Sequence, residues 1–119
     1  MNGAMEMSAS RKFMLFKNIL IPMILSGRKT QTRRKRSGGW KVGDIVAVKD
    51  RPNSKPACFI QIVGKYRQRL GDLSPEDIHK EGFNNFEEFR KFWKKIYGGW
   101  NPKIFVTVYE FRVIKRRKK

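Results

Sequence analysis

Alternating apolar residues in the stretch 103–114 constrain the fold more than any other feature of this sequence. Ile104, Val106 and Val108 fall on one face of an extended segment. The opposite face carries the residues Phe105, Thr107, Tyr109 and Phe111. A strand that is apolar on both faces must be covered on both, which is typical of a barrel or a strongly bent sheet.

The other elements are predicted from alternation and from helix start and stop signals. Extended segments are expected at residues 13–16, 30–34, 45–49 and 57–68, and helices at residues 22–26, 74–82 and 84–98. The apolar stripe of the last helix, which we assign to the core, consists of Phe86, Phe89, Trp93 and Ile96. The order strand, helix, several strands, two helices, long strand predicts an α+β fold, a small mixed β-barrel with short helices capping it.

The second helix has clear boundaries. Ser74 is expected to be its N-cap, Pro75 lies in its first turn, and Gly82 is a suitable stop. Glu81 therefore lies at the C-terminal end of this helix, where a carboxylate opposes the helix dipole. This unfavourable placement is compatible with a functional role.

The length of 119 residues allows one domain with one core. We expect a flexible N-terminal tail over residues 1–10, a domain over residues 11–114 and a basic tail over residues 115–119. The domain is expected to be a monomer.

The charge is strongly positive. Against 28 lysines and arginines there are 10 acids, which gives a formal net charge of +18. Such a balance favours a polyanionic partner, with RNA expected ahead of DNA, although a ribosome-like structural role or a merely charged surface gives the same composition. Residues 72–88 carry six of the ten acids, and we expect this segment to face away from RNA or to place selected carboxylates at a site.

Cysteine and histidine are too scarce for common metal sites. Cys58 is the only cysteine and His79 the only histidine, so neither an intrachain disulfide nor a zinc site is expected. No metal and no cofactor are predicted. The longest apolar run, residues 19–25, is too short to span a bilayer, and no secretion signal is recognised, so a cytoplasmic protein without membrane association is expected.

The segment from Ser26 to Arg34, with the sequence SGRKTQTRR, is the most informative for function. A helix-stopping glycine delivers Lys29 into a basic extended segment. The period of two then places Thr30, Thr32 and Arg34 on one face and Gln31 and Arg33 on the other.

This segment, the apolar helix before it and the Lys41-Val42-Gly43-Asp44 turn after it resemble the ASCH (activating signal cointegrator homology) domain over about residues 13–114. The resemblance implies a PUA-like pseudo-barrel with a cleft lined by the glycine-lysine-threonine segment. It also implies a role in RNA binding or RNA modification.

One bacterial branch of this family is especially similar: small amidohydrolases that remove the acyl group of N4-acetylcytidine. Its lysine, threonine and glutamate fall on Lys29, Thr32 and Glu81. The resemblance implies that Lys29 accepts a proton, Thr32 is the nucleophile and Glu81 donates a proton. The alternatives are a phosphate contact for Lys29, a half-buried strand position for Thr32 and an ion pair with a neighbouring arginine for Glu81.

The chemistry is also plausible from the residues alone. A threonine hydroxyl needs a nearby base, and an amine crowded by Arg28, Arg33 and Arg34 is pushed towards its neutral form. Neutral Lys29 would then accept the proton of the Thr32 hydroxyl.

The sequence departs from the bacterial deacylases in being much more basic and in having a different loop at residues 37–40. A free nucleoside gains little from many cations, whereas an RNA chain gains from each phosphate contact. We therefore favour an RNA-binding domain, with the amidohydrolase as the alternative and a ribonuclease, which lacks a histidine pair, as the third. Besides the basic C-terminal tail, the candidate contacts to RNA are Arg28, Arg33, Arg34, Lys35, Arg36 and Lys41, with Trp40, Tyr66 and Trp100 as candidate stacking residues.

Overall fold

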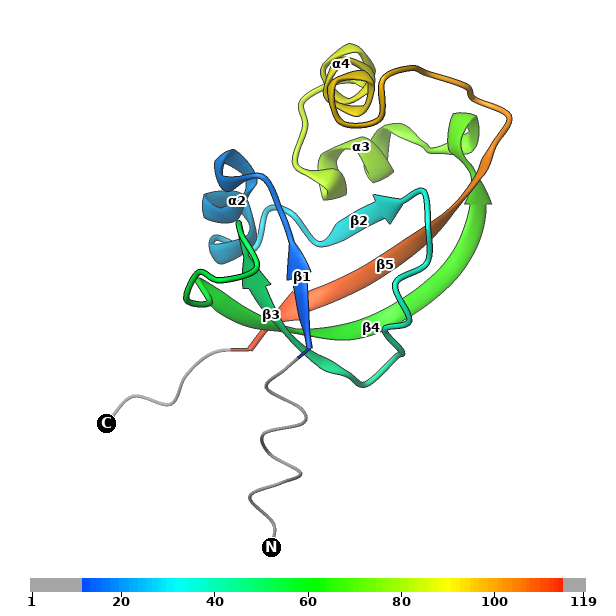
Figure 1. The fold of residues 1–119 in the computed structure, drawn as a ribbon. Coiled ribbons are helices and arrows are strands. Elements are labelled where there is room, and N and C mark those ends of the chain that lie inside the picture. The colour runs from blue at the N-terminus through cyan, green and yellow to red at the C-terminus, as the bar shows by residue number, and fades with distance from the viewer. Residues whose placement is uncertain (1–11, 115–119) are drawn as a thin grey trace, which may run out of the picture.

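A computed structural model describes residues 12–114 and contains one five-stranded mixed sheet with helices on its concave side (Figure 1). The strands are β1 (Phe13–Leu15), β2 (Gln31–Arg34), β3 (Ile45–Lys49), β4 (Cys58–Arg69) and β5 (Phe105–Val113). The helices are α2 (Ile21–Leu25), α3 (Pro75–Glu81) and α4 (Phe86–Tyr97), with short 3-10 turns η1 (Asn18–Leu20) and η2 (Leu70–Asp72). The predicted α+β class and the order of elements are confirmed. The two predicted tails, residues 1–10 and 115–119, lie outside the described residues.

The sheet has the order β1-β3-β4-β5-β2 and is dominated by the long antiparallel pair β4 and β5. These strands pair from Ile60 with Val113 to Arg69 with Phe105, and the register shifts between Ile62 and Gly64, where the ladder is irregular. β1 and β3 are parallel. Within residues 12–114, no backbone ladder joins the edge strands β1 and β2, so closure into a complete barrel stays a prediction.

A side chain nevertheless connects the two edges. Arg34, on β2, donates a hydrogen bond of 2.9 Å from Nη2 to the carbonyl oxygen of Leu15, on β1. Its guanidinium also lies 4.8 Å from the centroid of the Phe16 ring. The end of β2 is therefore tied to β1 without strand pairing.

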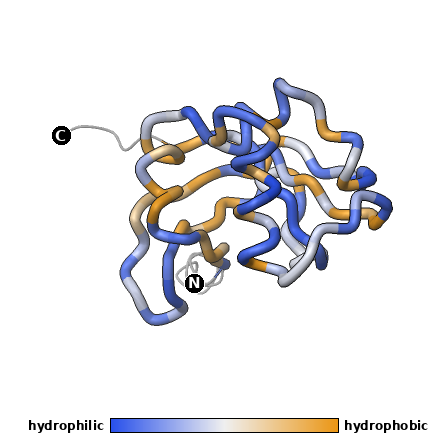
Figure 2. Tube along the Cα trace, turned by 90° about the horizontal axis from the view of Figure 1, so that it is seen from above, coloured by the Kyte–Doolittle hydropathy of each residue, from blue (hydrophilic) through white to orange (hydrophobic). Residues whose placement is uncertain are grey.

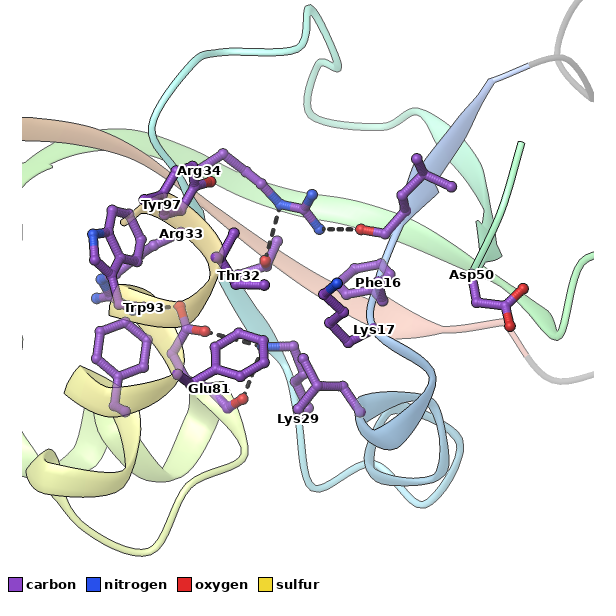
Figure 3. Close-up of a pocket in the computed structure, with 15 residues that line it drawn as sticks. Phe16, Lys17, Lys29, Thr32, Arg33, Arg34, Asp50, Glu81, Trp93 and Tyr97 are labelled. Carbon is purple, nitrogen blue, oxygen red and sulfur yellow. Dashed lines mark hydrogen bonds and ion pairs between the residues drawn. The ribbon is translucent and has the colours of Figure 1, made fainter. Parts of the chain in front are cut away.

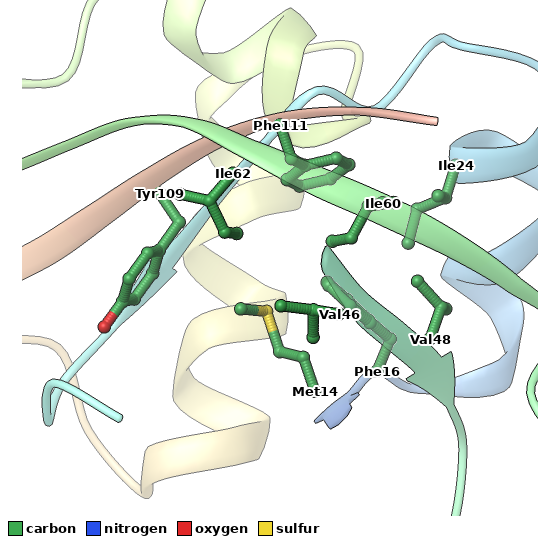
Figure 4. Packing of buried hydrophobic residues seen from close by; sticks show 9 residues of the cluster. All are labelled: Met14, Phe16, Ile24, Val46, Val48, Ile60, Ile62, Tyr109 and Phe111. Atoms are coloured by element: carbon green, nitrogen blue, oxygen red, sulfur yellow. The ribbon is translucent and has the colours of Figure 1, made fainter. Parts of the chain in front are cut away.

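The core consists of two clusters, and β5 contributes residues to both. The first cluster (Figure 4) comprises Met14, Phe16, Ile24, Val46, Val48, Ile60, Ile62, Tyr109 and Phe111. The second lies beneath the longer helices and comprises Leu20, Leu70, Leu73, Ile78, Phe83, Phe89, Trp93 and Val106. Coverage of both faces is confirmed for most of the strand. Phe105 is the exception, since it is 51% exposed and lies under the guanidinium groups of Arg67 and Arg69.

The helix boundaries follow the capping signals. Ser74 caps α3 by accepting a 3.1 Å hydrogen bond from the Asp77 amide, and Gly82 ends the helix with φ of +102°. Asn85 caps α4 in the same way, through the amide of Glu88. The predicted core stripe of α4 is only half correct. Phe89 and Trp93 are buried, whereas Phe86 and Ile96 are 39% and 37% exposed.

Hydrophilic and hydrophobic residues are interleaved along the chain (Figure 2). No helix within residues 12–114 combines the length and the apolar character required to cross a membrane.

Gly82 is predicted to tolerate alanine less well than Gly98, which ends α4. Both have positive φ, +102° and +85°, so either substitution should cost about 1 kcal/mol of unfolding free energy from backbone strain. A Cβ at Gly82 would also lie 2.9 Å from Met23 Sδ, whereas one at Gly98 would meet nothing within 4 Å. Displacing Met23 should add roughly 1 kcal/mol for Gly82→Ala. Urea unfolding of the two variants measures this, and equal losses would contradict the packing argument.

Candidate functional site

The C-terminal end of α3 meets the start of β2 through a buried ion pair. Lys29 Nζ donates to Glu81 Oε1 at 3.0 Å and to the Glu81 carbonyl oxygen at 2.8 Å, and both side chains are at most 4% exposed. The adjacent Thr30 amide donates to the Lys80 carbonyl at 2.8 Å. An ammonium group at unpaired helix carbonyls is electrostatically favourable, so Lys29 compensates for the carboxylate placed at this helix end.

Arg33 holds the other side of the Glu81 carboxylate. Its Nη1 donates to Glu81 Oε2 at 3.0 Å and to Gln31 Oε1 at 2.7 Å. Its remaining nitrogens contact Gln68 Oε1 at 2.8 and 3.1 Å and Asp77 Oδ2 at 3.3 Å. Because the Arg33 side chain is buried and committed to these partners, it is not available at the surface for a phosphate. We therefore leave it out of the RNA contacts that the sequence suggested.

The polar side chains of this cluster follow the spacing of a strand on one side and of a helix on the other. Lys29, Gln31 and Arg33 alternate along one face of the extended segment, and Asp77 and Glu81 are four residues apart on one face of α3. Each spacing can be found in the sequence, but the pairing of Arg33 with Glu81 depends on where α3 packs and has no sequence signal of its own.

Thr32 belongs to the opposite face of β2. Its Oγ1 accepts a 3.1 Å hydrogen bond from Arg34 Nε, and the described residues include no hydrogen bond from Thr32 to Lys29 or Glu81. All three nevertheless line one pocket (Figure 3). Thr32 and Arg33, neighbours on the edge strand β2 that project from its opposite faces, both border this pocket. The structure thus joins Lys29 and Glu81 directly and brings Thr32 into the same hollow.

The pocket has a volume of about 250 Å³. Polar groups of Lys29, Thr32, Arg34 and Glu81 border it on one side, and α4 supplies a largely aromatic wall. Its lining residues are Leu15, Phe16, Lys17, Leu20, Lys29, Thr32, Arg33, Arg34, Asp50, Glu81, Phe89, Phe92, Trp93, Ile96 and Tyr97. The α4 wall was not predicted from the sequence, because the apolar stripe of that helix was assigned to the core alone.

The pKa of Lys29 is lowered from its ordinary value of 10.5, chiefly because the ammonium group is buried. Glu81 acts in the opposite direction, while Arg34 and Arg33 add to the lowering. The direction expected from the sequence is confirmed, but burial is a larger cause than the neighbouring arginines. Arg28 is not among the causes, since its exposed guanidinium donates instead to Asn84 Oδ1 at 2.7 Å.

The other basic candidates lie on the surface near β2. Lys35, Arg36 and Lys41 are exposed. The backbone amide of Lys35 donates to Tyr97 Oη at 3.3 Å, which ties the loop after β2 to the aromatic wall of the pocket.

The candidate stacking residues are engaged within the protein. Trp40 packs edge-on against Tyr109, with ring centroids 5.3 Å apart, and Trp100 packs against Trp93 and other aromatic residues of the helical cluster. Tyr66 is 40% exposed and its hydroxyl donates to Glu110 Oε2 at 3.4 Å. Burial and the Glu110 charge raise the pKa of Tyr66. Among residues 12–114, no group of three or more potential metal ligands comes together.

The fold is PUA-like, with a pocket beside the glycine-lysine-threonine segment. A family model described as the ASCH domain matches residues 11–115, and the chain belongs to this family. A search of curated proteins finds no match.

Solved structures of two ASCH domains and of a third protein have a similar fold. The ASCH domain from Lactobacillus crispatus has a TM-score of 0.69 at 17% identity, with 86% of this chain and 76% of that chain covered. ASCH from Zymomonas mobilis has a TM-score of 0.63 at 17% identity, with 87% and 68% covered. Protein EF3133 from Enterococcus faecalis has a TM-score of 0.66 at 21% identity, with 81% and 67% covered. At these identities the similarity concerns the fold.

Removing either partner of the buried pair is predicted to destabilise the domain, but unequally. Glu81→Gln leaves Lys29 and Arg33 as buried cations without their shared carboxylate, and should cost about 3–5 kcal/mol of unfolding free energy. Lys29→Met should cost less, because Arg33 still neutralises Glu81. Exposed Glu87, which lies 3.7 Å from Arg90, is the control, and Glu87→Gln should change stability little. Urea unfolding tests the order, and a larger loss for Lys29→Met would contradict it.

Proposed function

We propose that this ASCH domain binds single-stranded RNA and holds one unpaired base in the pocket beside Lys29, Thr32 and Glu81. The observation that carries the proposal is the pocket's composition: an aromatic wall faces a set of buried hydrogen-bonding groups. An unpaired base needs both features, a surface for its ring and polar partners for its edge.

The size of the pocket supports a base rather than a larger ligand. Its volume of about 250 Å³ is below the roughly 300–1,000 Å³ of sites for drug-sized molecules. Trp93 and Tyr97, from α4, border it, while the Lys29–Glu81 pair offers a charged donor and acceptor at its polar side.

The distribution of charge supports a polymer rather than a free nucleoside. The most buried cations, Lys29 and Arg33, are neutralised by Glu81 and Asp77. The formal net charge of +18 is therefore available for other partners. Each cation that contacts an RNA phosphate increases the affinity through counterion release.

RNA binding is predicted to depend on salt and to survive loss of the Thr32 hydroxyl. The affinity for single-stranded RNA should fall as salt rises, with a logarithmic slope of about 0.7 per phosphate contact. Thr32→Val, which keeps the shape of the side chain, should bind within about fivefold of the parent, because one neutral hydrogen bond contributes only about 1 kcal/mol. Fluorescence anisotropy with single-stranded, duplex and structured RNA at two salt concentrations tests this. Absent or salt-insensitive binding would count against the proposal, and a gel of the same RNA would detect strand scission by a ribonuclease.

A second candidate is deacylation of N4-acetylcytidine or a similar acylated base. The favouring observation is the 3.0 Å contact between Lys29 Nζ and Glu81 Oε1, in a buried place where the pKa of Lys29 is lowered. One proton moved from Lys29 to Glu81 turns this ion pair into a neutral amine and a carboxylic acid, which are the base and the acid that amide cleavage needs.

The proposed reaction then proceeds in two stages. Thr32 Oγ1 attacks the acyl carbonyl carbon while Lys29 accepts the hydroxyl proton, and the tetrahedral intermediate collapses as Glu81 protonates the departing base nitrogen. The acyl group is left as an ester on Thr32. Water then attacks this ester, giving the carboxylic acid and restoring the hydroxyl. Arg34, which lies 3.1 Å from Thr32 Oγ1, would have to release that oxygen before the attack.

If the domain is a deacylase, its rate is predicted to fall at high pH, because the reaction needs the one proton that Lys29 and Glu81 share. That proton is lost as the pH rises through the pKa of Lys29, which burial lowers from 10.5, so the fall should begin below that pH. Chromatography of cytidine released from N4-acetylcytidine, free and within RNA, measures the rate. Thr32→Val should abolish turnover while RNA affinity is retained. No turnover by the parent, or equal turnover by Thr32→Val, would eliminate this candidate.

A further inference from the structure

A second hollow lies beside the pocket, between η1 and α4, and has a volume of about 630 Å³. It is lined by Lys17, Asn18, Ile19, Lys91, Phe92, Lys95 and Ile96. We call it the η1–α4 groove. The residues of its two walls are separated by more than 70 positions in the sequence, so only the folded chain brings them together.

The charged groups of the groove are all lysines. Lys17, Lys91 and Lys95 are exposed, and no ion pair formed within the described part of the chain involves any of them. Lys91 and Lys95 are four residues apart and therefore project from the same side of α4. Three cations around one hollow make it complementary to an anionic ligand.

Apart from Asn18, apolar side chains form the rest of the groove. Ile19 is 65% exposed and Ile96 is 37% exposed, and the partly buried Phe92 lies between the lysines in sequence. A ligand that offers only negative charge would leave this surface uncovered. Nucleotides offer both negative charge and a packing surface, because phosphates contact the cations and the base or sugar packs on the apolar side chains.

The groove is continuous with the pocket, since Lys17, Phe92 and Ile96 line both hollows. We propose that it binds the nucleotides adjoining the base held in the pocket, with the three lysines contacting phosphodiester groups. This inference rests on the proposed RNA-binding function and specifies the path of the strand. It places the strand along η1 and α4, rather than only along the basic segment after β2.

Two carboxylates lie near the proposed path, one before the groove residues of α4 and one beside the pocket. Glu88 lies about one turn before Lys91 on α4, where its Oε1 accepts a 2.9 Å hydrogen bond from the Asn84 amide. Asp50 borders the pocket, away from the groove lining. A phosphate chain should therefore leave through the lysines and avoid both carboxylates.

The test compares a groove variant with a variant of equal charge. Lys91→Gln/Lys95→Gln removes two groove cations, and Arg67→Gln/Arg69→Gln removes two exposed cations of β4 that line neither hollow. Anisotropy titrations of both variants and the parent use a fluorescent mononucleotide, a trinucleotide and a longer uridine strand. The groove variant should bind the longer strand roughly tenfold more weakly and lose about 0.7 of the salt slope for each phosphate contact. Its affinity for the mononucleotide should be unchanged, and the β4 variant should resemble the parent.

The outcomes separate this inference from the proposed function. If the parent binds no RNA, both fail. If the parent binds RNA and the groove variant matches the β4 variant, only the path through the groove is overturned. Competition by polyglutamate as effective as that by polyuridine would also overturn it, because it would point to an acidic polypeptide as the ligand. Circular dichroism of the variants checks that the fold is intact.

Discussion

The position of the Glu81 carboxylate between Lys29 and Arg33 is the constraint on which the rest of the site depends. Its two oxygens each accept a hydrogen bond of 3.0 Å, one from each cation. Lys29 also binds the main-chain carbonyl of Glu81 at 2.8 Å, so the pair fixes the end of α3 as well as its side chain. Since α4 follows α3 after only four residues, this contact also sets where the aromatic wall lies relative to β2.

The buried cluster is balanced in charge and in hydrogen bonds. Two cations, Lys29 and Arg33, meet two carboxylates, Asp77 and Glu81. Within residues 12–114, no buried side-chain nitrogen or oxygen lacks a hydrogen-bond partner. Complete pairing matters because a buried charge without a partner is far more costly than a surface one. The six acids of the segment 72–88 thus divide into two groups: Asp77 and Glu81 join the cluster with Lys29 and Arg33, and the other four are exposed.

Local signals predicted the elements, whereas contacts between distant elements decided the site. Capping residues and glycines located α2, α3 and α4, and alternation located the strands, because these signals act within a few residues. The same period separated Thr32 from Arg33, yet it could not reveal that Arg33 is buried, which depends on where α3 packs. Trp40 shows the same limit: an aromatic residue among cations suggested base stacking, but its ring packs on Tyr109. The η1–α4 groove was not predicted because its walls come from opposite parts of the chain.

The contrast between paired and unpaired cations gives the two hollows different chemistry. A cation already neutralised by a carboxylate attracts a phosphate weakly, but it still offers a directed hydrogen bond, which suits the edge of an uncharged base. The exposed lysines of the groove have no such partner among the described residues, so their interaction with a phosphate is not opposed by a neighbouring carboxylate. The pocket would therefore contribute selection among bases, and the groove would contribute most of the salt-dependent affinity. A single RNA strand that spans the pocket and the groove can use both contributions, whereas a free nucleoside, which has no phosphate, can use only the pocket.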